Sequence, residues 1–151
     1  MTRKLGALSL LLLLAGCGGG ESASEQSREQ AERTEAAKGL PTCDAPPMTA
    51  PPPAAFPRTF PLPSGTVITS AQRLPQNGAS IQGVVPLSLK RAAAYFTKRV
   101  PAAGFTPGVA DSEPWEAESE FSGNGLEGKW KVNELPGCAE KAALLVAVAE
   151  K

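Results

Sequence analysis

The chain has no histidine among its 151 residues, so it lacks the side chain that most often serves as a general base and as a metal ligand. Aromatic residues make up only 5% of the sequence, which leaves few large side chains for a core. An excess of positive charge is also missing, because 15 Lys and Arg residues balance 15 Asp and Glu residues. This balance argues against a nucleic-acid partner. Gly and Pro occur 15 times each, which disfavours an all-helical bundle.

The N-terminus carries the pattern of a secretory signal. Arg3 and Lys4 form a short positive region, and an apolar run from Leu5 to Leu14 follows. This run is too short to span a membrane, because a spanning helix needs about 20 apolar residues. Small residues come next, as they do before a cleavage site. The alternative, a buried helix at the start of a cytosolic protein, fits this pattern less well.

The segment Leu14-Ala15-Gly16-Cys17 resembles the lipobox of bacterial lipoproteins, and the resemblance covers the first 17 residues only. It implies that residues 1–16 are a signal peptide and that Cys17, modified with a diacylglycerol, becomes the first residue of the mature chain. Two acyl chains hold a protein on a membrane durably, whereas one does so only marginally. The resemblance therefore implies a protein anchored by lipid in the cell envelope, outside the cytoplasm.

Two segments separate Cys17 from the expected domain at 64–151. Residues 17–40 are polar and lack an apolar stripe, so we expect a flexible, mostly disordered tether. Residues 41–63 contain nine prolines, which favour an extended polyproline II spacer. A recognition motif for an aromatic groove is the alternative, although composition alone implies no partner. We expect the folded unit to begin near Phe56 or Phe60.

A hairpin is predicted at the start of the domain. The strand-like runs 66–74 and 79–85 flank Asn77-Gly78, which is a strong signal for a two-residue turn. With these two residues at the centre of the turn, Leu74 faces Ile81. Four apolar residues then share the inner face of the hairpin, namely Ile68, Leu74, Ile81 and Val85.

One helix is predicted after this hairpin. Ser88 suits its N-cap, and apolar residues recur on one helical stripe at Leu89, Ala93, Phe96 and Val100. Pro101 must kink or end the helix, and Gly104 suits the position after its C-cap. We therefore expect the helix to end between Val100 and Ala103.

The clearest strand pattern lies at 115–135, where two alternating runs flank Asn124-Gly125. A two-residue turn there predicts opposite pairs that include Glu120 with Lys129, Glu118 with Lys131, and Phe121 with Gly128. Charge pairing and apolar pairing both fit this register, which indicates a real hairpin.

The last apolar run, 142–149, fits either a helix or a strand. We expect a central strand covered on both faces, because the run is short and contains Val146 and Val148. The sequence therefore predicts an α+β fold, with a mainly antiparallel sheet of four to five strands and one helix packed on one face.

Some motifs suggest a site but have simpler explanations. Gly123, Gly125 and Gly128 match the spacing of a dinucleotide-binding loop, yet a strand rather than a helix follows, so a hairpin turn is preferred. The glutamates of the same hairpin lie in a row that does not converge on a cation, which favours a solvated charged ladder. Trp115, expected to be partly exposed, is the preferred contact residue, and Tyr95 is expected at the border of the helix stripe.

The cysteines predict a disulfide. Once Cys17 is lipidated, Cys43 and Cys138 remain, and neither belongs to a Cys-x-x-Cys motif. In an oxidising compartment we expect them to pair, with two free thiols as the alternative. No cofactor or metal site is predicted.

Catalytic motifs are scarce, since no serine is followed by lysine at the third position. We therefore expect a non-enzymatic, membrane-anchored envelope lipoprotein. Its small domain would bind an envelope protein or ligand, and no nucleic acid. A carrier of a small apolar ligand is the alternative, and an enzyme that works without histidine is the third possibility.

Overall fold

The computed structural model describes residues 23–151. The expected signal peptide, 1–16, and the lipobox residue Cys17 lie outside the described residues. The elements, in chain order, are α1 (Ala23–Ala36), β1 (Val67–Leu74), β2 (Gly78–Val85), α2 (Leu89–Ala102), β3 (Thr106–Glu113), β4 (Glu116–Gly123), β5 (Leu126–Glu134) and β6 (Ala142–Glu150). Neither described helix is both long enough and apolar enough to cross a membrane.

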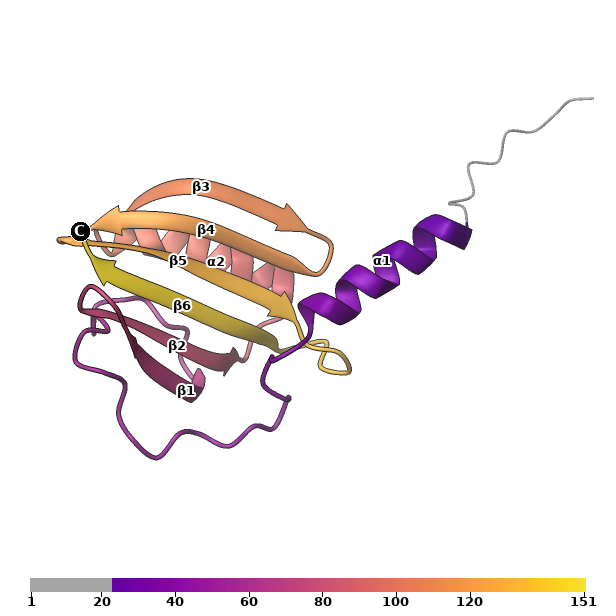
Figure 1. The fold of residues 1–151 in the computed structure, drawn as a ribbon, viewed down its shortest axis with the longest axis horizontal. Coiled ribbons are helices and arrows are strands. Elements are labelled where there is room, and N and C mark those ends of the chain that lie inside the picture. Colours follow the sequence, from indigo (N-terminus) through magenta and orange to yellow (C-terminus); the bar gives the residue numbers. More distant parts are fainter. Residues whose placement is uncertain (1–22) are drawn as a thin grey trace, which may run out of the picture.

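The strands form one antiparallel sheet in the spatial order β1-β2-β6-β5-β4-β3 (Figure 1). The predicted central strand is confirmed, since β6 lies between β2 and β5. Its coverage on both faces is not, because Leu145 and Ala147 on the outer face are half-exposed. The α+β class and the antiparallel pairing are confirmed. The predicted four to five strands are too few, since residues 23–151 form six strands. One helix, α2, packs on the sheet as predicted, and these residues also form a second helix, α1.

The strand that the sequence did not predict is β3. All eight of its residues are exposed, and its sequence, TPGVADSE, lacks alternating apolar residues. The period-two pattern of a half-buried strand is therefore absent. Pairing with β4 forms this strand, with an irregularity between Pro107 and Ala110. Proline and bulges are typical of edge strands, where a missing backbone donor does not interrupt a ladder.

Helix α2 packs on one face of the sheet. Its buried side chains are Ala92, Phe96 and Val100. The predicted stripe is confirmed, since Phe96 and Val100 are buried and Leu89 and Ala93 are partly buried against the core, with Ala92 as an additional buried residue. Pro101 lies in the last turn, and Gly104 follows the helix with φ 89°. Ser88 is the N-cap, although its side chain makes no capping hydrogen bond.

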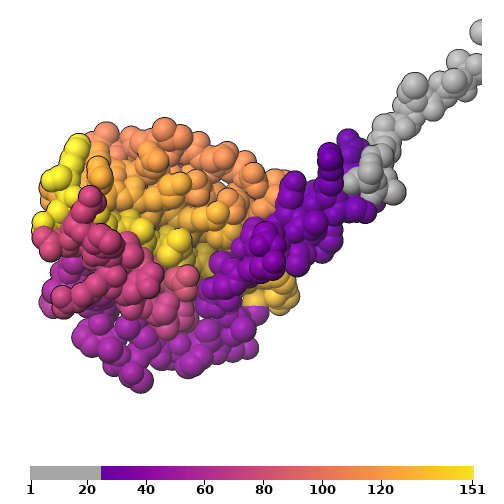
Figure 2. All heavy atoms as spheres, viewed as in Figure 1, coloured from indigo at the N-terminus to yellow at the C-terminus, as the bar shows by residue number. Residues whose placement is uncertain are grey.

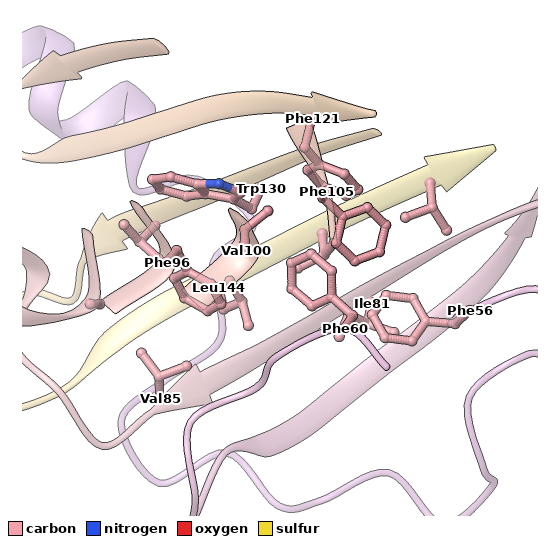
Figure 3. Close-up of a cluster of buried hydrophobic side chains, with 14 of the residues drawn as sticks. Phe56, Phe60, Ile81, Val85, Phe96, Val100, Phe105, Phe121, Trp130 and Leu144 are labelled. Atoms are coloured by element: carbon pink, nitrogen blue, oxygen red, sulfur yellow. The ribbon is translucent and has the colours of Figure 1, made fainter. Parts of the chain in front are cut away.

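All five phenylalanines of the chain belong to the main core, which Figure 3 shows. Phe60 lies at the centre of the group. Its ring centroid lies between 5.4 and 6.1 Å from those of four others, Phe56, Phe96, Phe105 and Phe121. Trp130 stacks on Phe96 with centroids 5.4 Å apart. Most of the few aromatic residues of this sequence are therefore concentrated in one cluster, and Trp115 is the exception.

The proline-rich segment, 41–63, is part of the fold and not a spacer. Phe56 and Phe60 are buried, as expected for the first core residues. The backbone N–H of Met48 donates to the carbonyl of Ile68, 2.8 Å away, so the segment also contacts β1. Figure 1 shows it running along the β1–β2 side of the sheet. The backbone is not continuously extended, because the N–H groups of Phe56 and Phe60 donate to carbonyls three residues earlier in tight turns. Both phenylalanines pack into the core.

The expected disordered tether is wrong over residues 23–36, which form α1. This helix is polar around most of its circumference and projects from the body of the protein (Figure 2). Its last turn contacts the domain, since Arg33 pairs with Glu134 at 2.7 Å. Because it buries so little, α1 depends on its own polar side-chain pairs and on this contact.

The predicted register of the first hairpin is wrong. Leu74 lies opposite Gly78, and Ala71 lies opposite Ile81. The turn residues with positive φ are Gln76 and Asn77, so Gly78 belongs to β2. A Cβ atom on Gly78 would lie 2.7 Å from the carbonyl oxygen of Val148. The glycine therefore allows β2 to approach β6 closely and does not form the turn.

Candidate functional site

The hairpin of β4 and β5 has the predicted register. The pairs are Glu120 with Lys129, Glu118 with Lys131, and Phe121 with Gly128. Asn124 and Gly125 have φ of 55° and 78°, as a two-residue hairpin turn requires. A Cβ atom on Gly128 would lie 2.7 Å from the Phe121 ring, so the glycine accommodates the aromatic side chain. The dinucleotide-like glycine spacing thus belongs to a hairpin.

The shortest ion pairs of this hairpin are diagonal and not directly across. The Nζ of Lys129 lies 2.8 Å from Glu118, and that of Lys131 lies 2.7 Å from Glu116. Lys131 and the opposite Glu118 are 3.8 Å apart. The twist of an antiparallel pair brings one diagonal neighbour closer, which explains the shift. The hydrogen bond from Lys129 to Glu118 raises the pKa of Lys129 above the usual 10.5. The row is a charged ladder, as expected.

Trp115 is not the exposed residue that the sequence suggests. Only 9% of its surface is exposed, and it lines a small hollow together with Arg33, Ala37 and Leu40. These three residues belong to α1 or follow it directly. The sequence suggested an exposed Trp115 because residues 17–40 were expected to be a disordered tether, which would cover no part of the domain.

Tyr95 lies at the border of the α2 stripe, as predicted, and is half-buried. Its hydroxyl donates a hydrogen bond to the carbonyl of Leu62, with 3.3 Å between the oxygens. The guanidinium of Arg99 lies 5.8 Å from the centre of its ring. Tyr95 therefore connects α2 to the end of the proline-rich segment.

The structure brings Cys43 and Cys138 to disulfide-bonding distance, with Cα atoms 6.1 Å apart. They lie in a second, smaller core cluster with Leu40, Val84, Leu135 and Ala143. Lys141 also donates to the carbonyl of Cys43 at 3.0 Å. These contacts attach the start of the proline-rich segment to the loop between β5 and β6.

The strongest candidate for a binding site is a groove of about 390 Å³ between α2 and the β3–β4 edge of the sheet. Its base contains buried aromatic and small residues, among them Phe96, Ala117, Ser119 and Trp130. Its rim contains exposed residues, among them Ala94 and Thr97 on α2 and Pro107 and Ala110 on β3. The groove therefore has an apolar base and opens to solvent along its length.

Small side chains on β3 create this groove. The pairing with β4 places Ala110 opposite Ser119 and Ser112 opposite Ala117, so Ala110 and Ser112 face α2. The space between a sheet and a helix packed on it is normally filled by larger apolar side chains. These two residues are too small to reach the helix, and the space remains open. Sequence analysis missed the groove because it did not predict β3.

The outer face of the same edge is acidic. Asp111 lies opposite Glu118, and Glu113 lies opposite Glu116. Since Lys129 and Lys131 pair with the two β4 glutamates, Asp111 and Glu113 have no ion pair within residues 23–151. Like charges directly opposite each other weaken strand pairing. The β3 edge therefore carries uncompensated negative charge beside an apolar groove.

Residues 23–151 contain no group of three His, Cys, Asp or Glu side chains that could hold a metal ion. Every buried side-chain nitrogen and oxygen in this part of the chain has a hydrogen-bond partner. Comparison of the chain with protein-family models, with curated proteins and with solved structures found no match.

Proposed function

We propose that the chain is a membrane-anchored lipoprotein of the bacterial envelope, and that its α+β domain is a non-enzymatic binding module. The lipobox-like segment that ends at Cys17 supports the anchor. The observation that carries the binding role is the apolar groove beside β3, whose outer edge pairs with no strand among residues 23–151. A solvent-open groove with an aromatic base is the surface on which an apolar or extended partner gains most from leaving water.

The arrangement of α1 supports presentation of the domain away from a membrane. Five residues lie between Cys17 and the start of α1 at Ala23. The helix projects from the domain (Figure 2), and its last turn is held by Arg33 and Glu134. A helix of 14 residues spans about 21 Å at 1.5 Å per residue. Lipid on Cys17 would thus hold the domain at a distance from the bilayer.

The anchor is tested by substitution of Cys17→Ser in the full chain. Expressed in bacteria with a clickable palmitate analogue, the unchanged protein should be labelled, processed and recovered in the detergent phase. The C17S variant should be unlabelled and should remain a precursor or be secreted. Cys43→Ser is the matched control and should be labelled normally. A labelled, processed C17S variant would show that the lipobox interpretation is wrong.

The binding role is tested by photo-crosslinking in intact cells. A photoreactive residue at Thr97, on the groove rim, should give a discrete adduct, whereas one at the exposed Ala54 should not. Filling the groove with Ser112→Trp should remove the adduct, because the new side chain would occupy the space that the partner needs. An adduct of equal yield from both positions, or one that survives S112W, would contradict a binding role for the groove.

A carrier of a small apolar ligand is the second candidate, favoured by the apolar base of the groove. Native mass spectrometry of the purified protein should then detect a bound lipid of defined mass, and S112W should lose it. A spectrum in which the unchanged protein and S112W carry the same adducts would dismiss the carrier. The exposed rim on both sides favours a partner that remains partly in solvent.

A further inference from the structure

The edge of the sheet at β3 is open, whereas the edge at β1 is partly covered. Strand β3 pairs only with β4 within residues 23–151, and nothing lies beyond it in Figure 1. At the other edge, the proline-rich segment reaches β1 through the hydrogen bond from Met48 to Ile68. An open edge presents a row of unpaired N–H and C=O groups on which another strand can align.

The two faces of this edge differ in chemistry. From Ala110 to Glu113, side chains alternate between the groove and the outer face. Ala110 and Ser112 border the apolar groove, while Asp111 and Glu113 point to the opposite face. A strand added beside β3 would place every second side chain over the groove and the others beside two carboxylates. The edge is therefore selective for a strand with two different faces.

The charge of the edge decides between possible occupants. A second copy paired through its own β3 would bring Asp111 and Glu113 of one chain beside those of the other, which like-charge repulsion disfavours. A fatty acid could fill the groove, but it would leave the backbone groups of β3 unpaired and would bring a carboxylate to an acidic edge. A basic extended segment satisfies the groove, the backbone and the charge together.

We propose that β3 binds an extended segment of a partner protein as a seventh strand, in which small apolar residues alternate with Lys or Arg. The apolar side chains would lie in the groove above Trp130. The basic side chains would pair with Asp111 and Glu113, which have no ion pair among the described residues. This inference rests on the proposed binding function and specifies the chemical class of the partner.

The test uses the full lipidated chain in nanodiscs of zwitterionic lipid, with empty nanodiscs as the blank. The probe is a fluorescent seven-residue peptide in which Lys and Val alternate. One control peptide has Glu in place of Lys, and another has the same composition with its lysines and valines grouped. Binding is followed by fluorescence anisotropy at low and high salt, and its position by hydrogen exchange of the backbone amides.

The critical variant is Asp111→Lys together with Glu113→Lys. It replaces two like-charge contacts by opposite-charge contacts with β4, so it should fold at least as stably as the unchanged protein. The matched control, Glu127→Lys with Glu140→Lys, makes the same change in net charge at two exposed positions away from β3. Thermal unfolding of both variants identifies any failure to fold.

We expect the alternating peptide to bind, to protect the amides of β3, and to bind more weakly at high salt. The D111K/E113K variant should bind it at least about tenfold more weakly, while E127K/E140K should bind it normally. Equal binding of the grouped peptide, protection away from β3, displacement of the peptide by a fatty acid, or absence of binding would each overturn the proposal. The anchor is judged separately, since loss of C17S labelling does not depend on the peptide.

Discussion

Substitution of Phe60→Ala tests whether the proline-rich segment is a structural part of the domain. The ring of Phe60 is 4% exposed and contacts four other phenylalanines. In a separate spacer, this substitution would have almost no effect on the stability of the domain. In the structure described here, it removes the centre of the aromatic core (Figure 3).

The expected magnitude follows from volume and area. Phenylalanine exceeds alanine by about 100 Å³, and a cavity that does not relax costs about 24 cal/mol per Å³, which gives about 2.4 kcal/mol. The apolar area lost is about 100 Å², and at about 25 cal/mol per Å² it adds about 2.5 kcal/mol. The sum of about 5 kcal/mol is an upper limit. Since residues 41–63 form a loop that can partly collapse into the space, we expect about 3 to 4 kcal/mol.

The assay is urea unfolding of the mature chain, followed by near-ultraviolet circular dichroism. Thr59→Ala is the matched control, because Thr59 is the exposed neighbour of Phe60, and it should change the free energy of unfolding by less than about 0.5 kcal/mol. Limited trypsin digestion gives a second readout, since loosening of the segment should speed cleavage after the exposed Arg58. A loss below about 1 kcal/mol in F60A, with unchanged cleavage, would refute the assignment of this segment to the core.

Three further predictions concern the cross-link and the second hairpin. Reduction of the cysteine pair should lower the free energy of unfolding by up to about 4 to 5 kcal/mol, because the two cysteines are 95 positions apart and their bond closes a long loop. Thiol titration before reduction should find no free thiol, and two free thiols would contradict the disulfide. Gly128→Ala should destabilise the domain by about 1 to 3 kcal/mol, since its Cβ would overlap a backbone carbonyl and the Phe121 ring, and an unchanged urea midpoint would argue against this packing. Lys131→Glu should cost about 0.5 kcal/mol, and Glu116→Lys should rescue it better than Glu118→Lys; equal rescue by both, in double-mutant cycles, would contradict the diagonal pairing.

The second hairpin could be predicted from sequence because several local signals agree. The Asn124-Gly125 turn, the alternation of side chains and the opposite charges all require the same register, and the structure has it. Only the choice of the nearest ion-pair partner differs from the prediction, because Lys131 lies closer to Glu116 than to the opposite Glu118. That choice depends on the twist of the finished sheet, which the order of residues along two strands does not encode.

The first hairpin shows how a distant contact overrides a local signal. Asn77-Gly78 is as strong a turn signal as Asn124-Gly125. Gly78 is nevertheless placed in β2, where Val148 of β6 leaves no room for a side chain. The partner strand lies 70 residues further along the chain, so no local pattern reveals this requirement. The predicted register was therefore wrong although the hairpin itself was correctly predicted.

Segments of unusual composition were misjudged for a related reason. Prolines in 41–63 predicted an extended spacer, but hydrogen-bonded turns at Phe56 and Phe60 interrupt the segment. A proline-rich segment can fold against a sheet as easily as it can extend into solvent. Whether it does so depends on whether the core lacks large side chains. The rest of this chain supplies few large side chains to the core, because aromatic residues make up only 5% of the sequence. Phe56 and Phe60 supply two of the five phenylalanines that fill the core.

The candidate site was hidden from sequence analysis by the property that forms it. A strand is recognised by large apolar residues at every second position. At Ala110 and Ser112, such residues would have marked β3 as a strand and would also have filled the space beside α2. The groove exists because the side chains at these positions are small. For the same reason, the sequence lacks the alternating apolar pattern by which a strand is recognised. An open edge of this kind becomes visible only when the neighbouring strand fixes which face each residue occupies.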